Sequence, residues 1–392
     1  MRVLFLASTF RPKIGGAETY ALNLARGLAA LGHTIEIVTD GSPGEADSSE
    51  LSTNISLKRL HLYRDRALTP EVIPWEEMAF GLLPELAVIA EAFRPDVIMS
   101  NSLDLCVPAK LASLTTGAPW VSTFHETAPE RVPMGEAILH LSYRLVEPDA
   151  VIAGSRFFLA RAEKFARSDR CHLIYHGIDT EHFRALDTAA EVRASYAIAL
   201  DATLIVSLGR FKERKGFLDL IGACASLKRT GKPIALIIAG SLNSASAAYL
   251  AEMRSLIAAS DVSDCVHIED SLKHDRAAWL LSGSDIVVQA SLEEGLGLAL
   301  IEAMACGRPV VATRIPAHCE IIDNDDVALL VEPRAPGEIA GALTLLIDDP
   351  RQRRRLGEHA RAHVVRNFSR DAMAAATARL LESVIRDRNG HG

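Results

Sequence analysis

The chain has 392 residues and a formal net charge of −8, with hydrophobic residues at 49% and charged residues at 23%. This composition excludes a disordered or collagen-like chain, and the length predicts two domains with a buried core in each. The negative charge disfavours a nucleic-acid partner.

Cysteines and apolar runs indicate the compartment. The six cysteines form no C-x-x-C pair, which is typical of reduced thiols in a cytosolic protein. The first apolar run, Val3–Ala7, is shorter than a signal-peptide core, and no run reaches the ~18 apolar residues of a membrane span. We therefore expect a cytoplasmic protein, whose only membrane contact would be peripheral, at the inner face.

The first half of the chain alternates strand and helix patterns. Val3–Ser8 predicts a buried strand, a glycine-bearing loop follows, and Ala17–Leu31 has apolar residues at helical spacing. The polar segment Gly41–Ser56 predicts a mobile loop. Further strands are predicted at Thr34–Thr39, Val97–Ser100, Trp120–Thr123, Ala150–Ala153 and His172–Ile174, and further helices at Leu83–Phe93 and Ser155–Ala166.

A second β/α series begins near residue 202. Its predicted strands are Leu204–Leu208, Ile234–Ala239, Val266–Ile268, Asp285–Gln289, Val310–Ala312 and Ala328–Val331, and its predicted helices are Phe217–Arg229, Ala247–Ala259 and Leu300–Ala305. Two such series predict an α/β protein with two doubly wound, Rossmann-like domains facing a cleft. We assign the domains to residues 1–180 and 181–368, and expect the amphipathic helix 369–386 to join the first.

Two loops have phosphate-binding chemistry. Gly15-Gly16 follows a strand and precedes a helix, where the backbone can approach an anion closely, although a tight turn explains the pair equally well. Arg210 and Lys215 lie in GRFKERKG after the second domain's first strand, and both cations suit phosphate oxygens. The alternative there is a solvated charged loop. Neither G-x-G-x-x-G nor a P-loop occurs.

A pair of carboxylates brackets a third loop. Glu294 and Glu302 are separated by seven residues that include Gly295 and Gly297. Such carboxylates can accept hydrogen bonds from sugar and ribose hydroxyls. A capped helix with an acidic first turn is the alternative.

The stretch Ser291–Thr313 resembles the signature of retaining glycosyltransferase family 4, whose fold is GT-B. The similarity continues in family order through short motifs that span nearly the whole chain: Gly15–Glu18, Leu31–His33, Ala153–Ser155, His176–Asp179, Gly209–Gly216 and Ile238–Ser241. The sequence departs from the usual pattern at His176, Leu296 and 317–320.

The resemblance implies transfer of a sugar from a nucleotide-activated donor with retention of configuration. It implies catalytic roles for His125, Arg210, Lys215 and Glu294, although a lone histidine after a strand is often only structural. It also implies that Glu294 orients the donor sugar and Glu302 the ribose. The implied donor-binding residues are Gly15, Gly16, Gly209, Arg210, Lys215, Gly240, Glu294, Gly295, Gly297, Leu298, Ala299 and Glu302.

The same resemblance implies a UDP- or GDP-sugar donor, a saccharide or lipid-linked acceptor, and no cofactor or essential metal. Asp323-Asn324-Asp325 spells D-x-D but lies in a polar turn, and we expect His359 and His363 on a solvated helix face. The rival hypotheses are a nucleotide-sugar epimerase of the same fold and a non-catalytic sugar-binding protein.

One segment bears on membrane contact. Val151–Arg170 carries a net charge of +3 and three phenylalanines, as in a helix that lies on anionic lipid. We favour the alternative, that the phenylalanines pack into the first domain.

Overall fold

The computed structural model describes residues 1–11, 15–41, 51–60, 75–126, 135–240, 246–273 and 276–390. It divides into two compact units, residues 1–177 with 370–392 and residues 178–369. The first segment of the first unit ends at residue 177, three residues before the domain boundary that the sequence predicts at residue 180.

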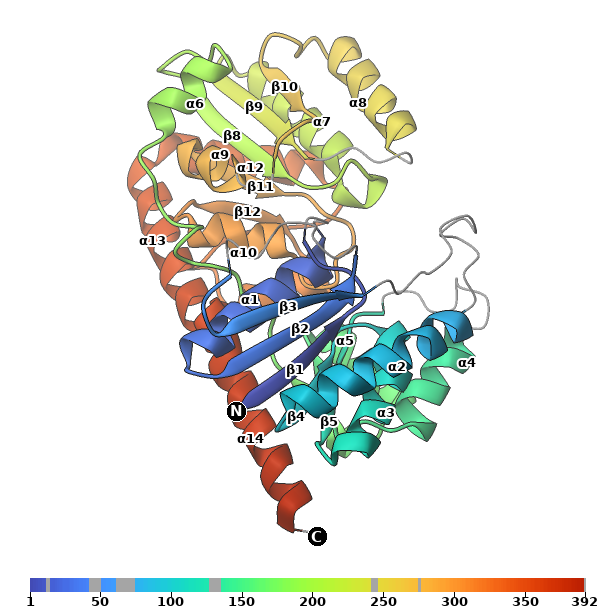
Figure 1. Ribbon diagram of the computed structural model, residues 1–392. Coiled ribbons are helices and arrows are strands. Elements are labelled where there is room, and N and C mark those ends of the chain that lie inside the picture. The colour runs from blue at the N-terminus through green and yellow to red at the C-terminus, as the bar shows by residue number, and fades with distance from the viewer. Residues whose placement is uncertain are drawn as a thin grey trace. The chain divides into compact units, whose positions relative to one another are not determined.

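The first unit contains a seven-stranded, all-parallel sheet in the order β3-β2-β1-β4-β5-β6-β7 (Figure 1). Its strands are β1 (Arg2–Ala7), β2 (Thr34–Asp40), β3 (Ile55–Leu60), β4 (Val97–Ser100), β5 (Trp120–Phe124), β6 (Ala150–Ala153) and β7 (Cys171–Leu173). Its helices are α1 (Gly16–Ala30), α2 (Trp75–Phe93), α3 (Cys106–Thr116), α4 (Gly135–His140), α5 (Arg156–Phe165) and α14 (Arg370–Gly390).

Helices cover both faces of this sheet, which is why its central strands are largely apolar. Leu4 and Leu6 of β1 point into a core shared with α2, α3 and α5. Val3 and Phe5 point the other way, into a core shared with α1 and α14. The C-terminal helix packs closely on α1, since a Cβ at Gly27 would lie 2.6 Å from the Cβ of Ala374.

The second unit contains a six-stranded parallel sheet in the order β10-β9-β8-β11-β12-β13. Its strands are β8 (Thr203–Leu208), β9 (Ile234–Ala239), β10 (Val266–Glu269), β11 (Ile286–Gln289), β12 (Val310–Thr313) and β13 (Leu329–Val331). Its helices are α6 (Ala189–Ser195), α7 (Phe217–Lys228), α8 (Ala247–Ala259), α9 (Ala277–Gly283), α10 (Leu298–Ala305), α11 (Pro316–Ile321), α12 (Pro336–Asp348) and α13 (Pro350–Asn367).

The predicted strands are confirmed to within one residue at both ends, whereas one strand and several helices were missed. Ile55–Leu60 forms β3, although its start was assigned to a mobile loop. This edge strand contains Lys58 and Arg59 among its apolar residues, so it lacks the aliphatic run that is typical of the other strands. Residues 42–50 of that predicted loop lie outside the described residues.

Helix α5 buries the phenylalanines of the basic segment, as expected. Phe158 is buried in the core, and Phe157 and Phe165 pack against the same cluster. Among the described helices, none combines the length and the hydropathy needed to cross a membrane.

In the turn before α7, adding one methyl group at Gly216 should strongly lower the free energy of unfolding. Gly216 has φ +64°, and a Cβ there would lie 2.0 Å from the backbone oxygen of Ala290. Left-handed backbone costs an L-residue about 1–2 kcal/mol, and the clash adds to it. We expect Gly216→Ala to destabilise the protein by more than 3 kcal/mol, about twice that cost, as measured by urea unfolding.

Gly231 is the matched control for this substitution. Its φ is +75°, but no atom of the described residues lies within 4 Å of where a Cβ would be. Gly231→Ala should therefore cost only the conformational term of about 1–2 kcal/mol. Equal losses in the two variants would show that the contact with Ala290 does not constrain the turn.

Candidate active site

The strand order of the second unit reverses between β8 and β11, and open parallel sheets bind ligands at such a switch point. The loop 209–216 follows β8, and the loop 291–297 follows β11. The two loops are joined, since the Leu292 amide donates to the Arg214 carbonyl over 2.7 Å. The structure thus brings together two motifs that are about 80 residues apart in the sequence.

A buried ion cluster links these loops. The Lys215 ammonium donates to Oε1 of Glu294, and Arg214 donates to Oε2 over 2.9 Å. The Ser291 hydroxyl also donates to Oε1, over 2.8 Å. Burial opposes ionisation of Glu294, but the two cations outweigh it and lower its pKa to about 2. Glu294 is therefore a carboxylate at neutral pH, and it compensates the charge of Lys215.

Sequence reasoning missed Arg214 and treated Lys215 and Arg210 alike. Arg214 lies in the same GRFKERKG motif, but the sequence could not show which of its cations points to Glu294. Arg210 is exposed, and it makes no hydrogen bond or ion pair with the part of the chain that the structure describes. Unlike Lys215, it therefore has no acidic partner among the described residues.

Gly209 and Gly240, which follow β8 and β9, allow close packing. The stem of Lys215 lies over Gly209, where a Cβ would be 3.1 Å from the lysine Cδ and Cε. A Cβ at Gly240 would lie 1.9 Å from the Gly209 oxygen. These contacts explain both glycines structurally, and their proposed contact with a donor stays a prediction.

Helix α10 starts directly after the carboxylate loop. Gly297, with φ +98°, precedes its first two residues, Leu298 and Ala299, which are half-buried. Backbone amides in the first turn of a helix have no intrahelical partner, so they can donate to an anion. Gly295 lies in the same loop and is also half-buried.

Glu302 lies one turn into α10, and its residue is only 8% exposed. Burial raises its pKa to about 8, although the nearby Lys215 charge acts in the opposite direction. The two carboxylates of the motif therefore differ in state: at pH 7 Glu294 is ionised and Glu302 is largely protonated.

This difference predicts a pH-dependent stability. The pKa of Glu302 is raised from 4.5 to about 8 on folding, so its contribution is fully present below 4.5 and is lost as pH rises towards 8. Glu302→Gln imitates the protonated acid. Urea unfolding gives the free energy of unfolding of the wild type and of the variant. We expect the wild-type value minus the variant value to fall by roughly 4 kcal/mol between pH 5 and 8. A pH-independent difference would contradict the assignment.

His318 is a further residue that was not predicted as part of the site. It is 1% exposed, and its Nδ1–H donates to the Thr313 carbonyl over 2.9 Å. Its ring edge lies 3.4 Å from where a Cβ on Gly297 would be. Burial lowers its pKa to about 4. The signal in the sequence is the departure from the family pattern at 317–320, which predicts an altered pocket around the donor sugar or base but assigns no role to His318 itself.

In the first unit, Gly15 and Gly16 begin α1 after β1. A Cβ on Gly15 would lie 2.4 Å from the carboxylate of Glu18, which accepts a hydrogen bond from Thr9 over 2.5 Å. Gly16 is exposed, and no described atom lies within 4 Å of where its Cβ would be. The space beside Gly16 therefore allows a ligand to approach its backbone.

His125 follows β5 and is held in one tautomer. Asn101 donates from Nδ2 to the Ala17 carbonyl over 3.0 Å, so its Oδ1 accepts the Nε2–H of His125 over 2.7 Å. Nδ1 then carries a lone pair. Burial lowers the pKa of His125 to about 4, which makes the ring neutral at pH 7.

Glu126, the residue after His125, and Asp104, which acts electrostatically on Glu126, are two acids that sequence reasoning did not assign to the site. Burial raises the pKa of Glu126 to about 7, with Asp104 acting in the same direction. Burial also raises the pKa of Asp104.

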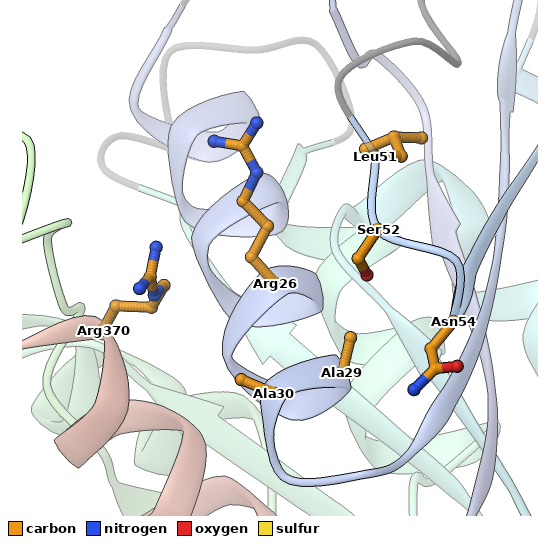
Figure 2. Close-up of a pocket in the computed structure, with 7 residues that line it drawn as sticks. All are labelled: Arg26, Ala29, Ala30, Leu51, Ser52, Asn54 and Arg370. Atoms are coloured by element: carbon orange, nitrogen blue, oxygen red, sulfur yellow. The ribbon is translucent and has the colours of Figure 1, made fainter.

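A surface hollow of about 410 Å³ lies in the first unit away from these residues. Figure 2 shows it between α1, the segment before β3 and the start of α14. It is lined by Arg26, Ala29, Ala30, Leu51, Ser52, Asn54 and Arg370. None of these belongs to the predicted site.

The metal-like motifs have structural contacts. Asn324 donates to Asp323 over 2.8 Å within the D-x-D turn. His359 is exposed, as predicted, but the prediction is wrong for His363, which is half-buried and bonds the Ile321 carbonyl over 2.8 Å. The side chain of His363 therefore faces α11 and not the solvent. Among the described residues there is no group of three or more possible metal-binding side chains.

Two family models match the chain, each over one unit. Glycosyltransferase Family 4 matches residues 14–182, and Glycosyl transferases group 1 matches residues 189–363. The chain belongs to the glycosyltransferases of the family 4 type. This result confirms the resemblance inferred from Ser291–Thr313 and identifies the protein as a sugar-transferring enzyme.

Curated relatives align over nearly the full length of this glycosyltransferase. It is 27% identical to the MMP alpha-(1->4)-mannosyltransferase of Mycolicibacterium hassiacum, covering 98% of both chains. It is 28% identical to a D-inositol 3-phosphate glycosyltransferase of Catenulispora acidiphila, covering 95% of this chain and 91% of the relative.

Solved structures share the fold. A glycosyltransferase from Rickettsia africae superimposes with a TM-score of 0.81 at 21% identity, covering 98% of each chain. HepE of Anabaena, solved with UDP and glucose, has a TM-score of 0.76 at 20% identity, covering 97% of this chain and 99% of HepE. The predicted GT-B architecture of two Rossmann-like domains is thereby confirmed.

Proposed function

We propose that this glycosyltransferase moves a hexose from a UDP- or GDP-sugar to an acceptor hydroxyl with retention of the anomeric configuration. The observation that carries the proposal is the buried Lys215–Glu294–Arg214 cluster at the β8/β11 switch point, beside the first-turn amides of α10. Further support comes from HepE, a structural neighbour solved with UDP-glucose.

The chemistry follows from charge. Breaking the bond between the sugar and the diphosphate leaves negative charge on the leaving phosphate oxygen. Lys215, Arg210 and the amides of Leu298 and Ala299 would stabilise this charge as it develops, which lowers the barrier to transfer. Because these groups supply positive charge themselves, we expect no bound metal to be required, and EDTA to leave the rate unchanged.

The carboxylates would hold the donor. Glu294, ionised and fixed by three donors, would accept a hydrogen bond from a sugar hydroxyl through the remaining lone pair of Oε2. Glu302, largely protonated at pH 7, can both donate to and accept from a ribose hydroxyl. The departing phosphate oxygen would take the acceptor proton in a same-face displacement.

The first unit would receive the acceptor. Gly16 would offer its backbone to the donor diphosphate, and His125 would contact the donor sugar with its neutral ring.

The acceptors named for relatives include inositol 3-phosphate and malate, which are small anions. We propose a saccharide or another small polar acceptor for this chain on that basis.

Peripheral membrane contact would accompany a lipid-linked acceptor. The side chains of Arg156, Lys164 and Arg167 are exposed around α5, although the neighbouring phenylalanines are used for core packing. Sedimentation with vesicles that contain anionic lipid, in low salt, tests this contact. Absence of the protein from the pellet would rule it out.

Product analysis tests the proposed reaction against its rivals. The protein is incubated with UDP- and GDP-hexoses and a panel of small acceptors, and the products are identified by mass spectrometry and NMR. Free nucleoside diphosphate together with an acceptor glycosylated with retention is expected. An isomerised donor would instead identify an epimerase, and tight binding without turnover a sugar-binding protein.

A further inference from the structure

The ring of His176 packs against His125 in the first unit. His176 lies after β7, and its ring centroid is 5.1 Å from that of His125 and 4.3 Å from that of Tyr20. Tyr20 also meets His125 edge-on at 5.2 Å. Each of the three rings therefore contacts the other two.

The structure accommodates His176 at a specific site. Residue 154 is glycine, and a Cβ there would lie 2.1–2.4 Å from three atoms of the His176 ring. The residue is 7% exposed, and its Nε2 is buried without a hydrogen-bond partner among the described residues. Buried polar atoms are normally paired, so a histidine kept here without a partner calls for a role beyond filling space.

We propose that His176 is a positioning residue for His125. Its ring, seated over Gly154 and against Tyr20, closes one side of His125, while Asn101 fixes the other through Nε2. His125 then presents Nδ1 in a single orientation. The inference rests on the proposed function only in assigning His125 to the site, because the ring contacts are independent of it.

The electrostatics agree with this arrangement. Burial is what lowers the pKa of His125, and His176 supplies part of the surface that buries it. Burial also lowers the pKa of His176, with His125 adding to the effect. Among the described residues, titratable groups at this end of the sheet include Tyr20 and Glu18 on α1, Glu126 after β5 and Asp104 after β4. Removing the His176 ring should therefore admit water and make His125 easier to protonate.

Histidine-selective NMR of the full chain tests the proposal without any substrate. In the wild type, His125 should be the Nε2–H tautomer and titrate near 4. In His176→Ala and Gly154→Ala, its pKa should rise towards 6.5, because water reaches the ring. His176→Phe keeps the ring and should preserve the wild-type state. His140 is an exposed histidine of the same unit. The variant His140→Asn serves as the control, because it removes a histidine signal without touching the His125 site.

Kinetics provide the second readout. His176→Ala and Gly154→Ala should lower kcat by about tenfold with little change in donor KM, and His176→Phe should restore most of the rate. Unchanged His125 titration in folded His176→Ala would overturn the proposal, and so would a His176→Phe variant that behaves like His176→Ala. If the wild type transfers no sugar, the proposed function fails, but the NMR comparison still decides the positioning role.

Discussion

Lys215→Ala should abolish stabilisation of the protein by a nucleotide sugar. The substitution removes the ammonium that neutralises Glu294 and leaves that buried carboxylate with Arg214 and Ser291 alone. Breaking a buried ion pair on one side costs about 3–5 kcal/mol, so the variant should also melt earlier without ligand. A donor at 100 times its Kd stabilises the wild type by roughly 2.7 kcal/mol. Thermal shift with UDP- and GDP-sugars measures both effects.

Two further variants make this result interpretable. Lys215→Met keeps the aliphatic stem over Gly209 and removes only the charge, so it should stay folded and still fail to respond to donor. Lys232→Ala removes a surface lysine paired with Asp348 in the same unit, and its response should equal that of the wild type. A full donor shift in Lys215→Met would refute the role of this charge.

The stability from Glu294 should also depend on pH. Its pKa falls from 4.5 in the unfolded chain to about 2 in the folded one, so its contribution is present above 4.5 and is lost as pH falls towards 2. This window lies below that of Glu302, whose contribution is lost between 4.5 and about 8. The two carboxylates of one motif therefore act on stability in opposite directions.

His125→Ala should slow sugar transfer by about 100-fold while donor affinity changes little. The ring is neutral, fixed by Asn101 and placed after β5, so we expect it to act on the reacting sugar more than on the nucleotide. Separate determination of kcat and of donor Kd by calorimetry measures the two effects.

His140→Ala provides the comparison, because His140 is exposed on α4 of the same unit. That variant should retain wild-type kcat. The pH profile adds a check: since the pKa of His125 is about 4, its protonation should not change the wild-type rate between pH 6 and 8. A His125→Ala variant with normal kcat would contradict the catalytic role and leave this histidine only a structural one.

Much of the fold was predictable because both sheets are buried on both faces. Apolar runs such as Val97–Ser100 and Ile234–Ala239 are typical of strands that helices cover on both faces, and the structure has strands at both. Ile55–Leu60 was missed because it lies at a sheet edge and is partly polar. Short helices such as Ala277–Gly283 carry too few turns to show a helical period.

The site was only partly predictable, because sequence patterns do not give side-chain partners. Lys215 and Glu294 were chosen separately, each for a different role, and the structure pairs them. Arg214 differs from Arg210 only in which way it points from the loop, and that depends on contacts with Glu293 and Glu294 made after folding. The contact between His125 and His176 joins residues that are about 50 positions apart, so no local motif could reveal it.

A calorimetric titration with UDP, UMP, GDP and GMP tests most directly the claim that the cations after β8 bind a nucleoside diphosphate. The wild type should bind one of the diphosphates at least tenfold more tightly than its monophosphate, because each additional charge-assisted phosphate contact contributes about 1.5–3 kcal/mol. Lys215→Met should lose that preference, and Lys232→Ala should keep it. Equal affinity of the wild type for diphosphate and monophosphate, or an unchanged preference in Lys215→Met, would contradict the account.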